Sequence, residues 1–142
     1  MRVRVLVACL LALGCVPALA LAGASAGTKT LTTTMKGAKE VPKGAPKGSG
    51  KAVVTLNAST GKVCWTFSNL KGLDKVTASH IHQAPVGKAG NVVVPFFAGT
   101  LKAKGCVTAS KSVVAAIVKK PNGYYVNIHT VKYPAGAIRG QL

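Results

Sequence analysis

The chain is a succession of short runs rich in β-branched and aromatic residues, separated by glycine, proline and lysine. Runs of this length and composition predict β-strands. The expected strands are 30–35, 52–57, 62–68, 76–83, 91–97, 101–108, 124–131 and 138–142. No repeat of 20–50 residues is visible, which argues against a solenoid. So many short strands favour an all-β antiparallel sandwich of seven to eight strands, and a small barrel is the other possibility.

Two of these strands carry informative patterns. Along 62–68, Val63, Trp65 and Phe67 share one face and Cys64 lies on the other, because side chains alternate along a strand. The pattern leaves open which face is inside for Cys64. The run 91–97 is almost continuously apolar, which is typical of a strand buried on both faces.

One segment, 110–119, predicts a short helix. Ser110 can cap it, and an apolar stripe follows at helical spacing. The stripe consists of Val113, Val114, Ile117 and Val118. Pro121 would end the helix.

The first 26 residues indicate a secretory signal peptide. Arg2 and Arg4 precede an apolar run, and no further charge occurs before Lys29. Gly14, Pro17 and the small residues after them argue against an uncleaved membrane anchor. The best cleavage site is Ala24-Ser25-Ala26, with Ala18-Leu19-Ala20 as a weaker alternative. We therefore expect a signal peptide at 1–26 and one domain at 27–142, secreted or otherwise extracytoplasmic, in the periplasm or cell envelope.

Cys64 and Cys106 remain after removal of such a leader. Two cysteines in an oxidising compartment most simply form one disulfide. Two buried free thiols are the alternative. No other long apolar segment follows residue 26, so no transmembrane segment is expected in the mature chain.

The predicted mature chain is strongly basic. Without Arg2 and Arg4, seventeen basic residues face only Glu40 and Asp74, a net charge of +15. Such a charge attracts polyanions without specifying one. Arg139 is the one arginine left, so sequence-specific nucleic-acid recognition, which favours arginine forks, is not expected. The candidate polyanion-binding residues lie in or beside the loop 36–51: Lys36, Lys39, Lys43, Lys47 and Lys51.

The three histidines form the clearest candidate site. His80 and His82 are two residues apart on an expected strand, so both side chains leave the same face. A neighbouring strand could bring His129 to the same point, and three imidazoles suit copper or zinc. Tyr125 and Asn127, on the face of His129, are candidates to orient an imidazole. The alternative is that the histidines hydrogen-bond loop carbonyls and hold the glycine loop 87–90.

Little supports an enzyme. Glu40 and Asp74 would be the entire carboxylate pair of a hydrolase, and both sit among lysines. Ser79 precedes His80 directly and points to the opposite face, so it is a poor nucleophile for that histidine. The glycines at 87–90 lead into a strand and not into a helix, which excludes a phosphate-binding loop.

Three blocks together resemble the CHRD domain, a family named for its occurrence in chordin. They are Met35–Pro42, with Glu40-Val41-Pro42, then 80–93, which begins His80-Ile81-His82, and 123–142, which contains His129 and ends Ile138-Arg139-Gly140-Gln141-Leu142. They occur in the family order and span about 31–142. Two positions depart from the family pattern: Asn91 replaces a frequent proline, and Ala137 a common glutamate, so this block supplies no carboxylate near Arg139.

The resemblance implies an extracellular immunoglobulin-like β-sandwich, in a family common among bacterial exported proteins. We expect a non-enzymatic exported domain that binds copper or zinc through His80, His82 and His129. The alternative is an envelope-interaction protein whose lysines bind anionic cell-envelope polymers.

The leader generates a first testable prediction. The exported protein should begin at Gly27, because Ala24 and Ala26 place small residues where signal peptidase reads them. Intact-mass measurement of the exported form checks this. A mass that includes residues 1–26 would show instead that the leader is retained.

Overall fold

The computed structural model describes residues 27–142, so the expected signal peptide lies outside the described residues. The strands are β1 (Thr28–Lys36), β2 (Ser49–Asn57), β3 (Lys62–Lys71), β4 (Val76–Gln83), β5 (Asn91–Ala98), β6 (Lys104–Thr108), β7 (Tyr124–Thr130) and β8 (Ile138–Gln141). The helices are α1 (Lys111–Lys119) and two short 3-10 turns, η1 (Gly37–Lys39) and η2 (Pro121–Gly123). The expected strands and the expected helix are all present, with ends that differ by a few residues.

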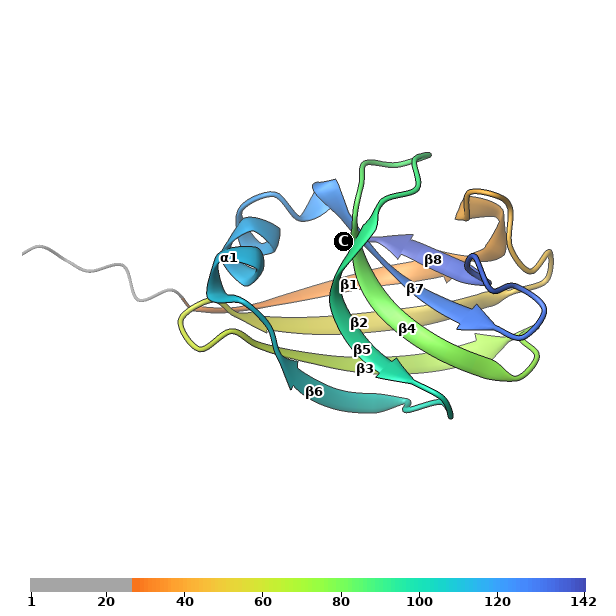
Figure 1. Ribbon diagram of the computed structural model, residues 1–142, viewed down its shortest axis with the longest axis horizontal. Helices are drawn as coiled ribbons and strands as arrows, with labels where there is room; N and C mark the ends of the chain where they lie inside the picture. The colour runs from red at the N-terminus through yellow and green to blue at the C-terminus, as the bar shows by residue number, and fades with distance from the viewer. Residues whose placement is uncertain (1–26) are drawn as a thin grey trace, which may run out of the picture.

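All eight strands belong to one antiparallel sheet in the order β5-β4-β7-β8-β1-β2-β3-β6. In Figure 1, β4, β5 and β7 cross in front of β1, β2 and β3, so the two halves of the sheet face each other. The halves join where Lys36 of β1 pairs with Arg139 of β8. At the other side, β5 and β6 come into contact without forming a ladder.

The expected all-β antiparallel class is confirmed, but the immunoglobulin-like sandwich is corrected. A sandwich has two separate sheets. Here β8 pairs with both β7 and β1, and this short strand carries the sheet from one half to the other. The result is a nearly closed, barrel-like sheet.

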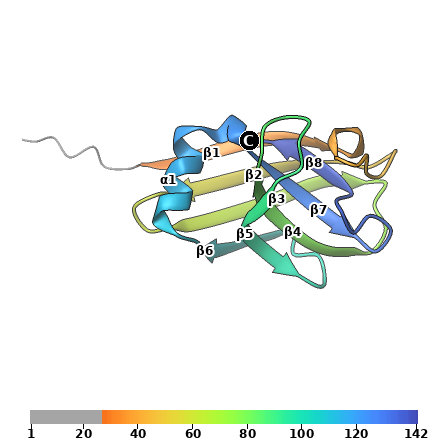
Figure 2. The ribbon, with the colours of Figure 1, turned by 45° about the horizontal axis from the view of Figure 1, so that its top comes forward.

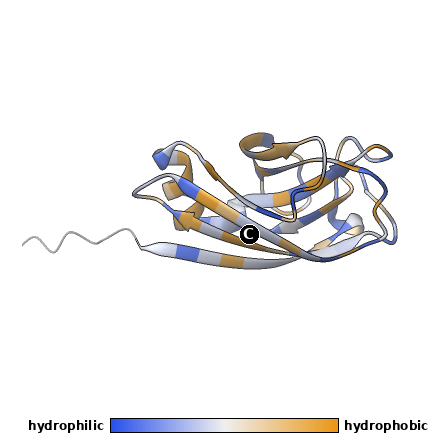
Figure 3. Ribbon diagram, turned by 90° about the horizontal axis from the view of Figure 1, so that it is seen from below, coloured by the Kyte–Doolittle hydropathy of each residue, from blue (hydrophilic) through white to orange (hydrophobic). Residues whose placement is uncertain are grey.

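The core fills the space between the two halves. Trp65 of β3 stacks on Phe96 of β5, with ring centroids 4.5 Å apart. Val63 and Phe67 are buried beside Trp65, which places Cys64 on the outer face. Figure 3 shows the underlying pattern, hydrophobic and hydrophilic residues alternating along the strands.

The expectation that 91–97 is buried on both faces is wrong. This segment is β5, which lies at an end of the sheet, and Val92 is 46% exposed. The strand buried on both faces is β7, all seven of whose residues are buried. An apolar run alone does not identify a central strand, because outer-face burial depends on which loops cover the sheet.

Helix α1 lies at the ends of the strands on one side of the molecule, where it contacts β2 (Figure 2). Val114 and Ile117 point into the core, as the predicted stripe requires. The Ser110 side chain does not cap the helix; its hydroxyl lies 2.8 Å from that of Ser112. Among residues 27–142, no helix is long and apolar enough to cross a membrane.

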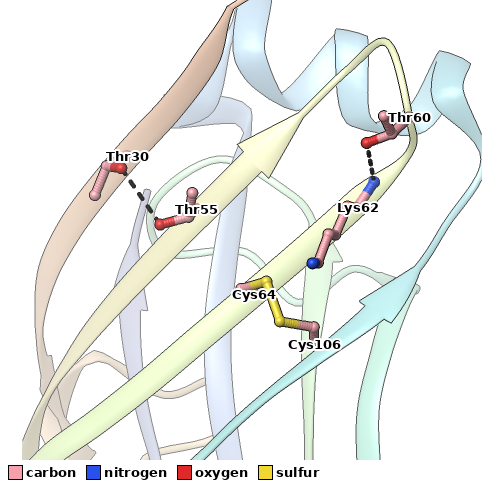
Figure 4. The surroundings of a disulfide bond; sticks show 6 residues. All are labelled: Thr30, Thr55, Thr60, Lys62, Cys64 and Cys106. Atoms are coloured by element: carbon pink, nitrogen blue, oxygen red, sulfur yellow. Dashed lines mark hydrogen bonds between the residues drawn. A yellow bond between two sulfur atoms is a disulfide. The ribbon is translucent and has the colours of Figure 1, made fainter.

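The predicted Cys64–Cys106 disulfide is confirmed. Cys64 of β3 is directly opposite Cys106 of β6 in the ladder, and the bond crosses the outer face (Figure 4). Threonines occupy neighbouring positions of that face, where Thr30 and Thr55 are hydrogen-bonded across β1 and β2. The bond therefore ties β6, an end strand, to the rest of the sheet.

We predict that replacing both cysteines, Cys64→Ala with Cys106→Ala, lowers the free energy of unfolding by about 4 kcal/mol, because the bond closes a loop of 42 residues in the unfolded chain. Chemical denaturation of the exported form measures this loss, and Thr66→Ala, on the same exposed face of β3, is the matched control. Thiol titration of the denatured, non-reduced protein should find no free thiol. Two free thiols would contradict the bridge.

Candidate metal centre

The pairing of β4 with β7 builds the candidate site. In this ladder His80 is opposite Asn127, His82 is opposite Tyr125, and Ala78 is opposite His129. Opposite residues share a face, and residues two apart on a strand share it too. All three histidines therefore lie on the same face of the β4–β7 pair. The other face carries Ile81, Val126 and Ile128 and is part of the hydrophobic core.

The three imidazoles converge. The candidate ligand nitrogens, one from each ring, all lie within 4.8 Å of one another. Nδ1 of His80 is 3.1 Å from Nε2 of His129. Two nitrogens bound to one zinc ion, each at about 2.0–2.1 Å, lie about 3 Å apart when their bonds meet near a right angle or somewhat wider. Without an ion this contact is a hydrogen bond from His80 Nδ1–H to the lone pair of His129 Nε2, and the same spacing also fits a single ion.

Hydrogen bonds to backbone carbonyls fix the orientation of two rings. Nδ1 of His82 is 2.8 Å from the Gly90 carbonyl oxygen, and Nδ1 of His129 is 2.9 Å from that of Pro134. A carbonyl can only accept, so both Nδ1 atoms carry the proton, and in the neutral rings Nε2 keeps its lone pair. The expected metal ligation and the alternative, bonding to loop carbonyls, therefore use different nitrogens of the same rings.

His82 gives the clearest sign of a missing partner. It is 8% exposed, and its Nε2 is buried with no partner in hydrogen-bonding geometry, although the Asn127 side chain lies close enough to raise the His82 pKa. Buried polar atoms are nearly always paired, and an orphan calls for an explanation. A metal ion shared with His80 and His129 would supply the partner.

Asn127 and Tyr125 lie beside these rings, as the sequence predicts, but they act differently. The Asn127 side-chain amide lies 3.0 Å from Nε2 of His129. Because that nitrogen keeps its lone pair, only the amide N–H of Asn127 can bond to it, which places the amide nitrogen and not Oδ1 toward the ring. Tyr125 makes no hydrogen bond to an imidazole. Its ring stacks on His82 with centroids 4.8 Å apart and planes 6° from parallel, and its hydroxyl accepts a bond from the Gly90 N–H. Tyr125 thus positions both His82 and the residue that orients it.

The stack continues to a buried ion pair. The Arg139 guanidinium carbon lies 4.0 Å from the centroid of the Tyr125 ring. Its Nε donates to Glu40 Oε2 at 2.7 Å, and a terminal nitrogen donates to the Lys88 carbonyl at 2.7 Å. Arg139 therefore does have a carboxylate partner, supplied by Glu40 and not by the position that Ala137 occupies.

Sequence reasoning missed this pair. The sequence places Glu40 in a lysine-rich loop and gives no indication of burial, yet it is 2% exposed. Burial raises the pKa of its carboxyl, while the hydrogen bond and charge of Arg139 oppose that rise. One signal was available, since Arg139 is the one arginine after the expected leader and Glu40 is one of two acids there.

The environment keeps the imidazoles neutral. Burial lowers the pKa of all three, and the nearby His129 and His82 help lower that of His80 to about 4. The carbonyl bonds from Gly90 and Pro134 oppose the shift for His82 and His129. Neutral imidazole is the form that ligates a metal.

The five lysines of the candidate polyanion-binding site, Lys36, Lys39, Lys43, Lys47 and Lys51, are not part of the histidine cluster. Each of them is exposed, on the connection between β1 and β2 or on the strand ends beside it. Lys39 donates to the Thr34 carbonyl at 3.0 Å.

Fold and site together define a small, disulfide-linked antiparallel β-domain with a three-histidine cluster on one face of its sheet. The CHRD domain family matches residues 31–142, and the chain belongs to this family. No curated protein and no solved structure matches the chain. The sequence blocks that suggested the family meet at the site, since Glu40, His82 and Arg139 each come from a different block.

The lowered pKa values generate a third prediction. Because the folded-state pKa of each histidine is below the unfolded value of about 6.5, the metal-free fold loses stability as the pH falls below 6.5. In an NMR titration of the metal-free protein, all three ring signals should have midpoints below 6.5, with His80 near 4. The protein unfolded in urea is the control and should titrate near 6.5. Ordinary midpoints in the folded protein would contradict the buried cluster.

Proposed function

We propose that this domain is an exported, non-enzymatic metal-binding protein, which holds one copper or zinc ion through His80, His82 and His129. The observation that carries the proposal is the buried, unpartnered Nε2 of His82, beside two other imidazoles whose ligand nitrogens lie within 4.8 Å. The proposal accounts for an orphaned atom that the fold otherwise leaves unexplained.

The donor set favours copper or zinc. Imidazole nitrogen suits both ions, whereas magnesium and calcium prefer carboxylates and carbonyls. Three protein ligands leave a coordination position for water or another small group. Within residues 27–142, the group of three or more possible ligands that comes together consists of histidines alone.

Two opposing effects set the affinity. The high positive charge disfavours a cation, and neutral imidazoles do nothing to offset it. Preorganisation works in the other direction, because the Gly90 and Pro134 carbonyls and the Tyr125 ring already orient two of the three ligands. We therefore expect a selective site of modest affinity.

The surroundings support a binding role over an enzymatic one. Ser79 is fully buried, and its hydroxyl donates to the Asn127 carbonyl at 2.6 Å, so it is no nucleophile for His80. Glu40 is engaged with Arg139 and does not reach the histidines as a free base. The disulfide supports export to an oxidising compartment.

A second function is contact with anionic envelope polymers. Exposure of all five loop lysines supports it. This function is supported only by the charge and exposure of the lysines and not by a defined arrangement of binding groups. It therefore ranks below the metal proposal.

We predict that protein 27–142, prepared without an affinity tag and stripped with a chelator, binds Zn(II) or Cu(II) one to one in calorimetry. His82→Ala should weaken binding at least about a hundredfold, because it removes one of three ligands from a preorganised site. Binding should persist below pH 6.5, since each ligand stays neutral until the pH falls through its lowered pKa.

Gln83→Ala is the matched control, because Gln83 is the exposed neighbour of His82 on β4. It should leave the affinity unchanged. Equal, weak uptake by wild type and His82→Ala would overturn the proposal.

A further inference from the structure

A hollow of about 600 Å³ lies beside the histidine cluster, between the β1–β2 connection and the β4–β5 loop. Its size is in the range of small-molecule sites, roughly 300–1,000 Å³. Arg139 and Gln141 of β8 contribute to its lining. The same Arg139 stacks on Tyr125, whose ring stacks on His82, so these two aromatic contacts connect the hollow to the histidine cluster.

Apolar side chains form two walls of the hollow. Ala38, Val41 and Pro42 come from the β1–β2 connection, and Val86 comes from the β4–β5 loop. Val41 is 38% exposed and Val86 is 76% exposed, the highest value among the exposed large hydrophobic residues of 27–142. Two exposed valines that flank one hollow are suited to contact an apolar body.

The charges around the hollow are unbalanced. Lys39, Lys43 and Arg139 line it together with one acid, Glu40, which is already paired with Arg139. The Arg139 guanidinium has five N–H groups, and three of them donate to Glu40, Lys88 and Val41. Two guanidinium N–H groups remain, but Arg139 is only 3% exposed, and Glu40 Oε1 has no hydrogen-bond partner. The accessible positive charge of the lining therefore comes from the exposed Lys39 and Lys43.

We propose that this hollow binds an amphipathic organic monoanion, a carboxylate with an apolar alkyl body. The body lies between Val41 and Val86, and the carboxylate faces the exposed Lys43. Charge complementarity selects the anion over a neutral molecule of the same shape, and the apolar walls select it over an inorganic anion. This site is separate from the metal proposal and does not depend on it.

Calorimetry of chelator-stripped protein 27–142 with octanoate, below its micelle concentration, tests the proposal. We expect one-to-one binding, about tenfold tighter than hexanoate, because two more methylene groups are buried. Octanol should bind at least about tenfold more weakly, and sodium sulfate should not compete at equal concentration. Octanol binding as tightly as octanoate, or no octanoate binding at all, would overturn the proposal.

Variants locate the site. Lys43→Glu and Val86→Glu change exposed side chains, so the fold should tolerate them, and each should weaken octanoate binding about tenfold or more. Lys102→Glu and Val131→Glu make the same changes at exposed positions outside the hollow and should leave the affinity unchanged. If Lys43→Glu and Lys102→Glu lowered the octanoate affinity equally, the binding would be general attraction of an anion to a cationic protein, and the proposal would be overturned.

Separate titrations of the same protein test the two proposals. Octanoate is titrated into chelator-stripped protein, so its binding requires no metal ion, and none of the three histidines lines the hollow. Octanoate binding without metal binding would therefore leave this proposal standing while the proposed function fails, and the reverse result would separate them equally well.

Discussion

The buried pair between Arg139 and Glu40 links the β1–β2 connection to β8 at the junction of the two halves of the sheet. Arg139 stands at the point where β8 pairs with β1, which is where the two halves of the sheet join. Its guanidinium also binds the β4–β5 loop at Lys88 and packs on Tyr125 of β7. Removing one partner of a buried pair typically destabilises a protein by roughly 3–5 kcal/mol, because the other charge stays buried. Here the loss of one partner would destabilise the pairing of β8 with β1, which connects the two halves of the sheet.

Packing contacts connect Arg139 to the histidine cluster. The Arg139 guanidinium packs on the Tyr125 ring, and the Tyr125 ring stacks on the His82 ring. The β4–β5 loop closes the arrangement, because Gly90 accepts from His82 and donates to Tyr125. A side chain at Gly90 would overlap the Gln83 carbonyl, so this tight turn requires glycine. The fold itself thus orients His82, and the Pro134 carbonyl orients His129 in the same way. The proposed binding of a cation by this cationic protein depends on that preorganisation.

The sequence predicted features set by neighbouring residues, such as strand positions and shared faces. It did not predict contacts between residues far apart in the chain. Period-two patterns located the strands, and the shared face of His80 and His82 followed from spacing alone. The partner of His82 across the ladder is Tyr125, and no local pattern specifies that register. Glu40 and Arg139 are 99 residues apart, so composition marked them as unusual without pairing them. The end position of β5 was hidden for the same reason: whether an apolar run lies at the centre or the edge of a sheet depends on the other strands.

The scarcity of acids explains why the proposed metal site consists of neutral ligands. Glu40 is engaged by Arg139, and Asp74 accepts a hydrogen bond from the Lys132 backbone N–H at 2.9 Å. Both acids of the predicted mature chain therefore have structural partners, and neither lies in the histidine cluster. A site built here must use imidazoles, which bind soft or borderline metal ions without a charged ligand. The same imbalance leaves the neighbouring hollow cationic. One compositional bias thus accounts for both the neutral three-histidine cluster and the cationic lining of the hollow, which the Tyr125–Arg139 stack connects.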